Sequence, residues 1–276
     1  MLKVIRSTGI WFSIMFMVFG FASTNLANKP EKLIVVCSTS IILDRVEEVG
    51  KSLIEVISIV PPGICPAHYD IKPSDIRAVG KASLVLSQGI EPWLNDLIKA
   101  SGNKNLKKIS VEGSTVPTKV IEEIRVIGDT LCKVNPENAS YYKENTHRLI
   151  NSIEKTAKKI KEKAKQLQIE RYKVICIKWQ EDFVKWVGFN VIKTYLPPER
   201  ISLKEALELF QIGKEFKVSI VVDNLQSGTY FGSKLSREIG ATHIVLTNFP
   251  GSFPETETYT KMLNYNANQL FNALKN

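Results

Sequence analysis

The chain has 276 residues, of which 44% are hydrophobic, and a formal net charge of +9. Without a leader of 27 residues, roughly 250 residues remain, enough for one large or two ordinary domains with real cores. Much of the lysine excess lies in residues 158–163, on a helix with a solvated face, and no basic stripe is interleaved with aromatic residues. The composition therefore gives no support for nucleic-acid binding.

Residues 1–27 have the pattern of an export signal. Lys3 and Arg6 precede an apolar run over 10–22, and small residues at Gly20 and Ala22 suit cleavage. The run is short for a membrane span, although an uncleaved N-terminal anchor is an alternative. No cysteine follows the run, so a lipid-modified N-terminus is not indicated. We expect an exported protein, located in the periplasm or at the cell surface.

The next part of the chain alternates predicted strands with predicted helices. The strands are expected at 33–37, 53–60, 82–87 and 106–111, and the helices at 41–49, from 73 onward, and at 91–100. The stretch that follows, as far as Cys132, is poorly patterned. Alternation of this kind predicts a parallel sheet, and hence an N-terminal α/β lobe over 32–134.

A long amphipathic helix is predicted over 135–168. Asn135 is a suitable N-cap and Pro136 a suitable first helical residue. Apolar residues recur at helical spacing, at Tyr142, Leu149, Ile153, Ala157, Ile160, Ala164 and Leu167. Such a helix would be on the order of 50 Å long, more than one small domain needs. Because α/β patterning lies on both sides, this helix is predicted to join two lobes.

The alternation then resumes in a second lobe, predicted over 171–276. Its strands are expected at 172–177, 191–195, 218–222 and 243–246, and its helices at 180–187, 202–216, 233–239 and 257–274. The predicted fold class is therefore α/β, with two Rossmann-like lobes of parallel strands joined by a single long linking helix. Ligands of open α/β sheets bind beyond the carboxyl ends of the strands, so a cleft between the lobes is the expected site.

Several short segments resemble one known family along nearly the whole chain, from 33 to 274. They are Val60–Gly63, Pro66–Asp70, Pro73–Asp75, Gly89–Leu94, Asn135–Ala139, Thr194–Glu199 and Ile239–Ala241. These segments resemble the solute-binding receptors of zinc and manganese ABC importers. The resemblance implies a monomeric receptor without enzymatic activity. It would bind a divalent or soft transition metal ion in the cleft and deliver it to a permease and its ATPase.

The usual ligands of that family are missing from this chain. Members usually hold the ion with three histidines and one carboxylate. The matching positions are Ala67, Leu131, about Ile177, and Thr247 or Asn248. The chain has only three histidines, of which only His68 lies near such a position. The chain therefore resembles a divergent member of the family that lacks the usual histidine ligands.

Cysteines lie near those positions instead. Thiolates suit zinc or Cu(I), and this predicts a thiolate-rich metal site from Cys65, His68, Cys132 and Cys176. Asp70, Asp223 and Asn248 are possible further contacts in the cleft. Two alternatives remain open: Cys65 and Cys132 form a disulfide, or the strand cysteines Cys37 and Cys176 are inert core residues.

Three other functions compete with a receptor for a bare ion. The first is a receptor for a metal chelate or a polar solute, gripped by the polar loops at 223–228 and 248–251. The second is a thiol oxidoreductase that uses Cys65 and His68, in which a neighbouring histidine lowers the thiol pKa. The third is a surface adhesion or scaffold protein that binds no small ligand.

Overall fold

The structure is a computed structural model that describes residues 32–274. The predicted leader over 1–27 lies outside the described residues. Within the described part of the chain, no helix combines the length and the apolar character that crossing a membrane requires.

The first lobe is built on a parallel sheet of four strands. They are β1 (Leu33–Thr39), β2 (Ile54–Val60), β3 (Leu84–Ser87) and β4 (Lys107–Ser110), in the order β2-β1-β3-β4. Helices α1 (Ser40–Gly50) and α4 (Pro117–Val134) cover the face that carries Val35 and Cys37. Helices α2 (Pro73–Lys81) and α3 (Leu94–Ser101) cover the face that carries Val36 and Val85. Burial on both faces explains why β1 is a continuous apolar run.

The second lobe repeats this strand order. Its strands are β5 (Lys173–Ile177), β6 (Asn190–Tyr195), β7 (Ile220–Asn224) and β8 (Thr242–Leu246), in the order β6-β5-β7-β8. Helices α6 (Glu181–Val187) and α9 (Tyr259–Asn272) pack on one face, and α7 (Leu203–Glu215) and α8 (Tyr230–Ile239) on the other. Helix α7 starts at a capping box, in which the hydroxyl of Ser202 accepts a hydrogen bond from the amide of Glu205 at 3.2 Å.

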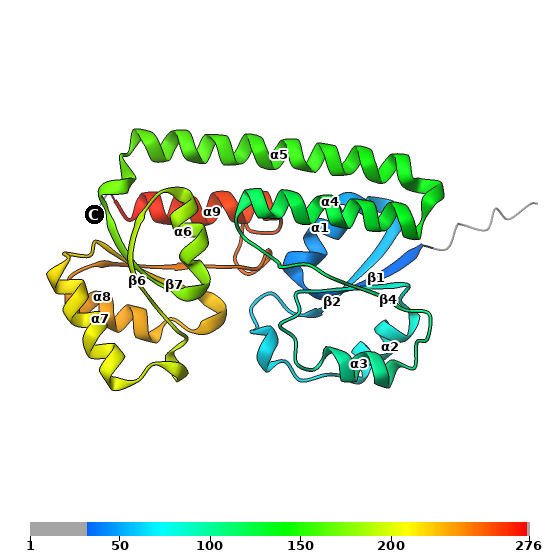
Figure 1. Cartoon of the computed structure of the whole chain (residues 1–276), viewed down its shortest axis with the longest axis horizontal. Coiled ribbons are helices and arrows are strands. Elements are labelled where there is room, and N and C mark those ends of the chain that lie inside the picture. The colour runs from blue at the N-terminus through cyan, green and yellow to red at the C-terminus, as the bar shows by residue number, and fades with distance from the viewer. Residues whose placement is uncertain (1–31, 275–276) are drawn as a thin grey trace, which may run out of the picture. The chain divides into compact units, whose positions relative to one another are not determined.

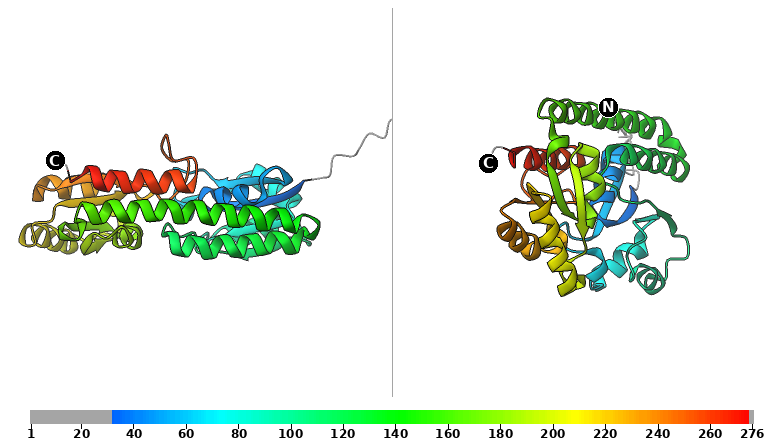
Figure 2. Two further views of the ribbon diagram at one scale, coloured as in Figure 1. Left: turned by 90° about the horizontal axis from the view of Figure 1, so that it is seen from above. Right: turned by 60° about the vertical axis from the view of Figure 1, so that its left-hand side comes forward.

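Helix α5 (Ala139–Gln166) runs along both lobes, as Figures 1 and 2 show. Its apolar stripe packs on α1 and α4 of the first lobe and on α9 of the second. Tyr142, Ile153 and Ile160 belong to a core that includes Val35 of one sheet and Val174 of the other. The two lobes therefore share one continuous core beneath α5, and this confirms the predicted two-lobed α/β fold.

The start of the linking helix differs from the prediction. A 3₁₀ turn occupies Pro136–Asn138, and the α-helix begins at Ala139. The side chain of Asn135 does not cap the helix backbone. Its Oδ1 instead accepts hydrogen bonds from Asn138 Nδ2 at 2.5 Å and from the Tyr142 hydroxyl at 3.2 Å.

Helix α4 was not predicted, because the stretch ending at Cys132 looked poorly patterned. Its fully buried residues are nevertheless at helical spacing, at Val120, Ile124, Ile127 and Leu131. Pro117 stands at the first helical position. Helix α4 packs closely along α5 at Gly128, where an added Cβ would lie 2.4 Å from Thr146 Oγ1. The linking element is therefore a hairpin of two helices, with α5 as the longer arm.

Candidate functional site: a groove between the lobes

A groove of about 280 Å³ lies between the two lobes. The first lobe contributes Glu112, Gly113, Ser114, Thr115 and Lys119, and the second contributes Lys178, Trp179, Glu181, Asp182 and Asn248. These residues follow β4, β5 and β8 or lie in the first turns of α4 and α6. The groove therefore lies at the carboxyl ends of the parallel strands, where ligands of such sheets bind.

The charged side chains of the groove neutralise one another. Lys119 Nζ lies 3.2 Å from Asp182 and 3.9 Å from Glu112, and the hydrogen bond that Lys119 donates to Asp182 raises the pKa of Lys119. Lys178 pairs with Glu181, whose pKa is lowered by the hydrogen bonds from Lys178 and Lys185. Because these lysines are about half exposed, each pair contributes little to stability. The lining has three carboxylates, Glu112, Glu181 and Asp182, against two lysines, and Lys185 beside the groove supplies the third positive charge through its pair with Glu181.

Amide side chains form the second-lobe side of the site. We call Gln180, Asn224, Gln226 and Asn248 the amide cluster; they lie at or just beyond the ends of β5, β7 and β8. Gln180 Nε2 donates to Asn248 Oδ1 at 2.8 Å, and the backbone amide of Asn248 donates to Gln226 Oε1 at 3.4 Å. The groove-lining Asn248 is thus connected to the fully buried Gln180.

Polar contacts join the lobes beside the amide cluster. Gln226 Nε2 donates to the backbone carbonyl of Pro62 at 2.9 Å, and the hydroxyl of Ser252 donates to the same oxygen at 2.9 Å. The hydroxyl of Ser40 donates to the carbonyl of Pro250 at 2.9 Å. These bonds connect the loop after β2 and the start of α1 to loops of the second lobe.

Several buried polar atoms at the strand ends have no hydrogen-bond partner within the described chain. In the second lobe they are Gln180 Oε1 and Asn224 Nδ2, and in the first the hydroxyls of Ser38 and Ser87. Ser38 and Ser87 are neighbours on adjacent strands, because Cys37 is in register with Leu86. A buried polar group without a partner costs about 1–3 kcal/mol, and such groups are uncommon in native proteins. These four atoms lie near the strand ends, but none of their residues lines the groove.

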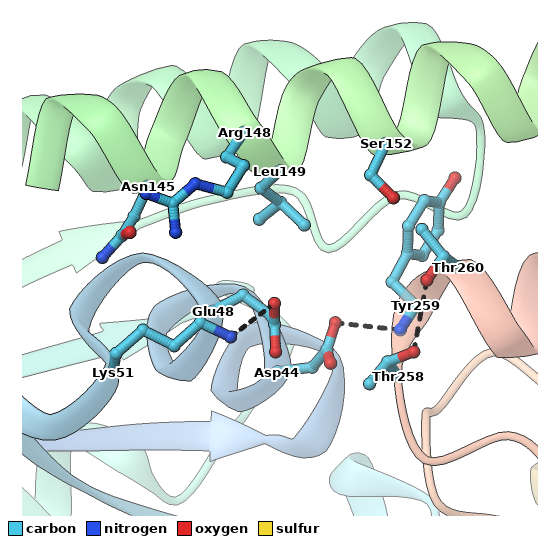
Figure 3. Close-up of a pocket in the computed structure, with 10 residues that line it drawn as sticks. All are labelled: Asp44, Glu48, Lys51, Asn145, Arg148, Leu149, Ser152, Thr258, Tyr259 and Thr260. Carbon is cyan, nitrogen blue, oxygen red and sulfur yellow. Dashed lines mark hydrogen bonds and ion pairs between the residues drawn. The ribbon is translucent and has the colours of Figure 1, made fainter.

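A second set of contacts joins the lobes beneath α5 (Figure 3). We call Asp44, Arg45, Glu123 and Tyr259 the clasp. Asp44 Oδ2 accepts a hydrogen bond from the backbone amide of Tyr259 at 2.9 Å, and the Tyr259 hydroxyl donates to the carbonyl of Thr115 at 2.8 Å. The Tyr259 ring lies 5.7 Å from the Arg45 guanidinium carbon. Tyr259 starts α9 of the second lobe, and the other residues belong to the first.

The clasp is charged and buried. Arg45 is fully buried, pairs with Glu123 and donates to the carbonyl of Ser114. Burial lowers the pKa of Arg45 to about 10 and raises the pKa of Asp44 to about 7. A hollow of about 330 Å³ borders Asp44 and Tyr259 on the α5 side. The polar walls of this hollow belong to the contact between the lobes and not to the groove.

The expected thiolate residues lie in separate places. Cys65 and His68 share the 3₁₀ turn after β2, where the amide of His68 donates to the carbonyl of Cys65 at 3.1 Å. Cys176 is fully buried in β5, and burial raises its thiol pKa to about 12. Cys132 lies in the last turn of α4, where its Sγ donates to the Ala139 carbonyl at 3.5 Å. Cys132 therefore belongs to the end of α4 and not to the linking helix α5.

The structure does not assemble the expected thiolate-rich site. Within residues 32–274, no three His, Cys, Asp or Glu side chains are grouped so that they could hold a metal ion. All four cysteines are free, so the alternative of a Cys65–Cys132 disulfide is wrong. The alternative of core cysteines holds for Cys37 and Cys176, which are fully buried.

The three expected further contacts also separate. Asp70 is exposed in the loop before α2, away from any such group. Asp223 is buried inside the second lobe, where it accepts from the Tyr195 hydroxyl at 2.5 Å and lies 2.7 Å from His243 Nε2. Only Asn248 of the three lines the groove.

Two of the positions that were matched to the family's ligands, by counting from the family-like segments, lie in the core. Leu131 is fully buried in α4, and Ile177 is fully buried at the end of β5, so neither side chain faces a ligand. Gln180 was missed as a candidate site residue, whereas Asn224 and Gln226 fall within the polar loop at 223–228 that was expected to grip a polar or chelated solute. A polar residue shortly after a buried strand is the signal that could have found Gln180, since β5 ends at Ile177.

Two parallel sheets that present their carboxyl ends to one groove, joined by a long helix, define a two-lobed solute-binding protein. The chain belongs to the family described as zinc-uptake complex component A, periplasmic (ZnuA), which it matches over residues 35–273.

Individual relatives share modest identity over most of the chain. A putative metal-binding protein of Treponema pallidum is 22% identical, covering 88% of this chain and 87% of its own length. The metal ABC transporter substrate-binding lipoprotein SsaB of Streptococcus sanguinis is 24% identical, covering 91% and 92%. Among solved structures, a periplasmic metal binding protein from Candidatus Liberibacter asiaticus has a TM-score of 0.77 at 19% identity, covering 88% of this chain and all of that one. These likenesses confirm the resemblance and the fold that the sequence indicated.

Proposed function

We propose that this protein is the extracytoplasmic receptor of a metal ABC importer. It captures its cargo in the groove between the lobes and presents it to a permease driven by an ATPase. The observation that carries the proposal is the family match over 35–273, which includes both sheets and the groove between them. Relatives named for metal ABC transport support it, among them SsaB of Streptococcus sanguinis and the manganese-binding lipoprotein MntA of Halalkalibacterium halodurans.

The cargo is a first-row transition metal, with zinc, manganese and iron as the candidates. Those three metals appear in the names of the family and of its relatives. No residue of the groove is asked to perform a reaction, so the protein acts by binding alone. We infer a monomer that meets the membrane only through its N-terminal segment and the permease.

The structure suggests how binding and release are limited. Helix α5 packs on both lobes, and the clasp fixes them on the α5 side. Large hinge opening would break these contacts and the shared core. Binding therefore orders the groove and the loops at 62, 226 and 252, and release needs only those loop contacts to loosen.

Calorimetry on the metal-stripped protein tests the proposal. Zinc, manganese and ferrous iron are titrated separately, each with and without small chelators, and binding at one site is expected. Trp179 is 48% exposed and lines the groove, so its fluorescence emission should change on binding. Trp179→Phe should remove the fluorescence change and leave the binding heat. Absence of binding for every metal in every form would contradict the proposal.

A further inference from the structure

One short loop forms most of the first-lobe side of the groove. Residues 112–115, which we call the β4–α4 loop, all line the groove, and Lys119 completes that side. We infer that Tyr259 of the second lobe is a positioning residue that holds this loop in its cargo-binding shape, so that contact between the lobes sets the affinity for cargo. This role rests on the proposed receptor function and assigns part of it to a residue that does not line the groove.

The β4–α4 loop has little hold of its own. Within residues 32–274, no backbone-to-backbone hydrogen bond joins residues 112–115 to the rest of the chain. Gly113 has a φ of +69°, which favours glycine, and a Cβ there would overlap the side chain of Gln88. Gln88 Nε2 donates to the carbonyl of Glu112 at 3.4 Å, at an exposed position. Such a loop keeps one conformation only if side chains hold its backbone.

Side chains of the clasp supply that hold. The guanidinium of Arg45 donates to the carbonyl of Ser114, and Glu123 Oε1 accepts from the amide of Ser114 at 2.9 Å. The Tyr259 hydroxyl donates to the carbonyl of Thr115, the next residue, at 2.8 Å. Arg45 and Glu123 belong to the first lobe, so the Tyr259 bond is the one of these contacts that depends on how the lobes meet.

Tyr259 is itself well fixed. Its backbone amide donates to Asp44 of the first lobe at 2.9 Å (Figure 3). Tyr259 is 1% exposed and Thr115 is 8% exposed, so bulk water does not replace the bond between them. Burial raises the pKa of Tyr259 above its ordinary value, so the hydroxyl remains a donor. A loop that is ordered before binding loses less conformational freedom when cargo arrives, and this increases affinity.

Two conservative variants separate this role from general stability. Tyr259→Phe removes the hydroxyl and keeps the ring and the amide. Tyr195→Phe is the matched control, because the Tyr195 hydroxyl also donates to a buried backbone carbonyl, that of Val222 at 3.0 Å, but stays inside the second lobe. Both variants lose a buried hydrogen bond and should lower the urea midpoint, so an effect on the β4–α4 loop is judged against the control.

Hydrogen exchange of the cargo-free proteins, followed by mass spectrometry, measures the loop directly. Peptides that cover 112–116 should exchange about fivefold faster in Tyr259→Phe and at an unchanged rate in Tyr195→Phe, since only the first variant frees the Thr115 carbonyl. Equal exchange of these amides in the two variants would overturn the inference.

Calorimetry with zinc, manganese and ferrous salts measures the consequence for cargo. For the metal that the unmodified protein binds, Tyr259→Phe should raise the dissociation constant about fivefold and Tyr195→Phe by less than about twofold, because a loop that must be ordered on binding costs affinity. Equal affinities of the two variants would also overturn the inference. Absence of metal binding by the unmodified protein would overturn the receptor function, whereas exchange measured without cargo would still show whether Tyr259 holds the loop.

The unmodified protein offers a further test that needs no variant. Coupling between two sites is reciprocal, so metal in the groove should also make the clasp firmer. Saturating metal should slow exchange about fivefold both at amides 112–116 and at amides 259–262, where α9 begins. Slower exchange at 112–116 with no change at 259–262 would overturn the coupling between Tyr259 and the groove.

Discussion

The clasp and the groove lie between the same two lobes and use opposite chemistry. The clasp buries an arginine against a glutamate and a carboxylate against a backbone amide. The groove side buries neutral amides and hydroxyls, several of which have no partner in the described chain, and leaves its charges at the exposed rim.

The difference separates two tasks. A buried ion pair is favourable only when its geometry is excellent. The Arg45–Glu123 pair lies within the first lobe and holds Arg45 beside the Tyr259 ring of the second lobe, where the lobes stay in contact. Neutral hydrogen-bonding groups can exchange a ligand for water at modest cost, so they belong where cargo enters and leaves. Substitutions at the clasp, at the rim of the groove and in the turn after β2 should separate these two tasks.

The largest expected effect is at the ion pair of the clasp. Arg45→Ala leaves Glu123 buried without its partner and should lower the free energy of unfolding by about 3–5 kcal/mol. Urea denaturation measures the change. The matched control is Arg125→Ala on α4 of the same lobe, where the pair with Glu122 is mostly exposed and worth less than about 1 kcal/mol. Equal losses for the two variants would contradict a special contribution from the buried Arg45–Glu123 pair.

The second prediction concerns pH and Asp44. Its folded pKa of about 7 lies above the ordinary value of 3.8, so the folded protein binds the proton more tightly. This contribution to stability is fully present below pH 4 and is lost as the pH rises toward 7, by up to about 1.4 kcal/mol per unit. Arg45 opposes the shift, whereas the neighbouring Glu47 and Glu48 increase it.

Asp44→Asn isolates this contribution. The amide oxygen can still accept from Tyr259, and no charge is buried. The difference in unfolding free energy between the variant and the unmodified protein should therefore grow in favour of the variant between pH 4 and pH 7. Glu122→Gln, which removes a mostly exposed pair with Arg125 on α4, should show no such trend. A flat difference for Asp44→Asn would mean that the carboxyl titrates as in water.

A smaller effect is expected at the rim of the groove. Lys119→Ala removes the bridge to Asp182 between the lobes, but both side chains are more than half exposed. Thermal unfolding should shift by less than about 1 kcal/mol in free energy, and the shift should shrink further in high salt. A large loss of unfolding free energy that salt does not reduce would show that the pair at the rim also holds the lobes together.

The smallest effect is expected in the turn after β2. Cys65→Ser should change neither the unfolding midpoint nor the affinity for cargo by more than about twofold, because no third ligand joins Cys65 and His68 within the described residues. Calorimetry on the variant measures the affinity, and Cys132→Ser serves as the matched thiol control. Loss of cargo binding in Cys65→Ser but not in Cys132→Ser would show that the Cys65 thiolate takes part in binding the cargo.

The fold was largely predictable because its strands are buried on both faces. Runs such as Leu33–Cys37 are typical of central strands, and their alternation with helices indicates a parallel sheet. Helix α4 was not predicted because its regularly spaced apolar residues are interrupted by charged and polar residues. The sequence pattern could not show why residue 128 is a glycine, because the reason is the close approach of Thr146 from helix α5.

The site was less predictable for a physical reason. Motif registers locate positions along the chain, but a ligand needs side chains from several strand ends to meet in space. Leu131 matched a register and is in the core, whereas Gln180 matched none of the family segments and lies beside the groove. The clasp depends on Asp44 and Tyr259, which are 215 residues apart, and no local pattern links them.

Tyr259 also sets an order of events during folding. Its amide, ring and hydroxyl all engage the first lobe, yet it is made near the end of the chain. Because the chain is synthesised from its N-terminus, the first sheet can form early. Asp44 and Arg45 can contact Tyr259 only after the last helix has been synthesised. Contacts so distant in sequence form slowly. A chain truncated before 259 should therefore lose both the Tyr259 contacts with the first lobe and the helix that covers one face of the second sheet, and that apolar face would be exposed to aggregation.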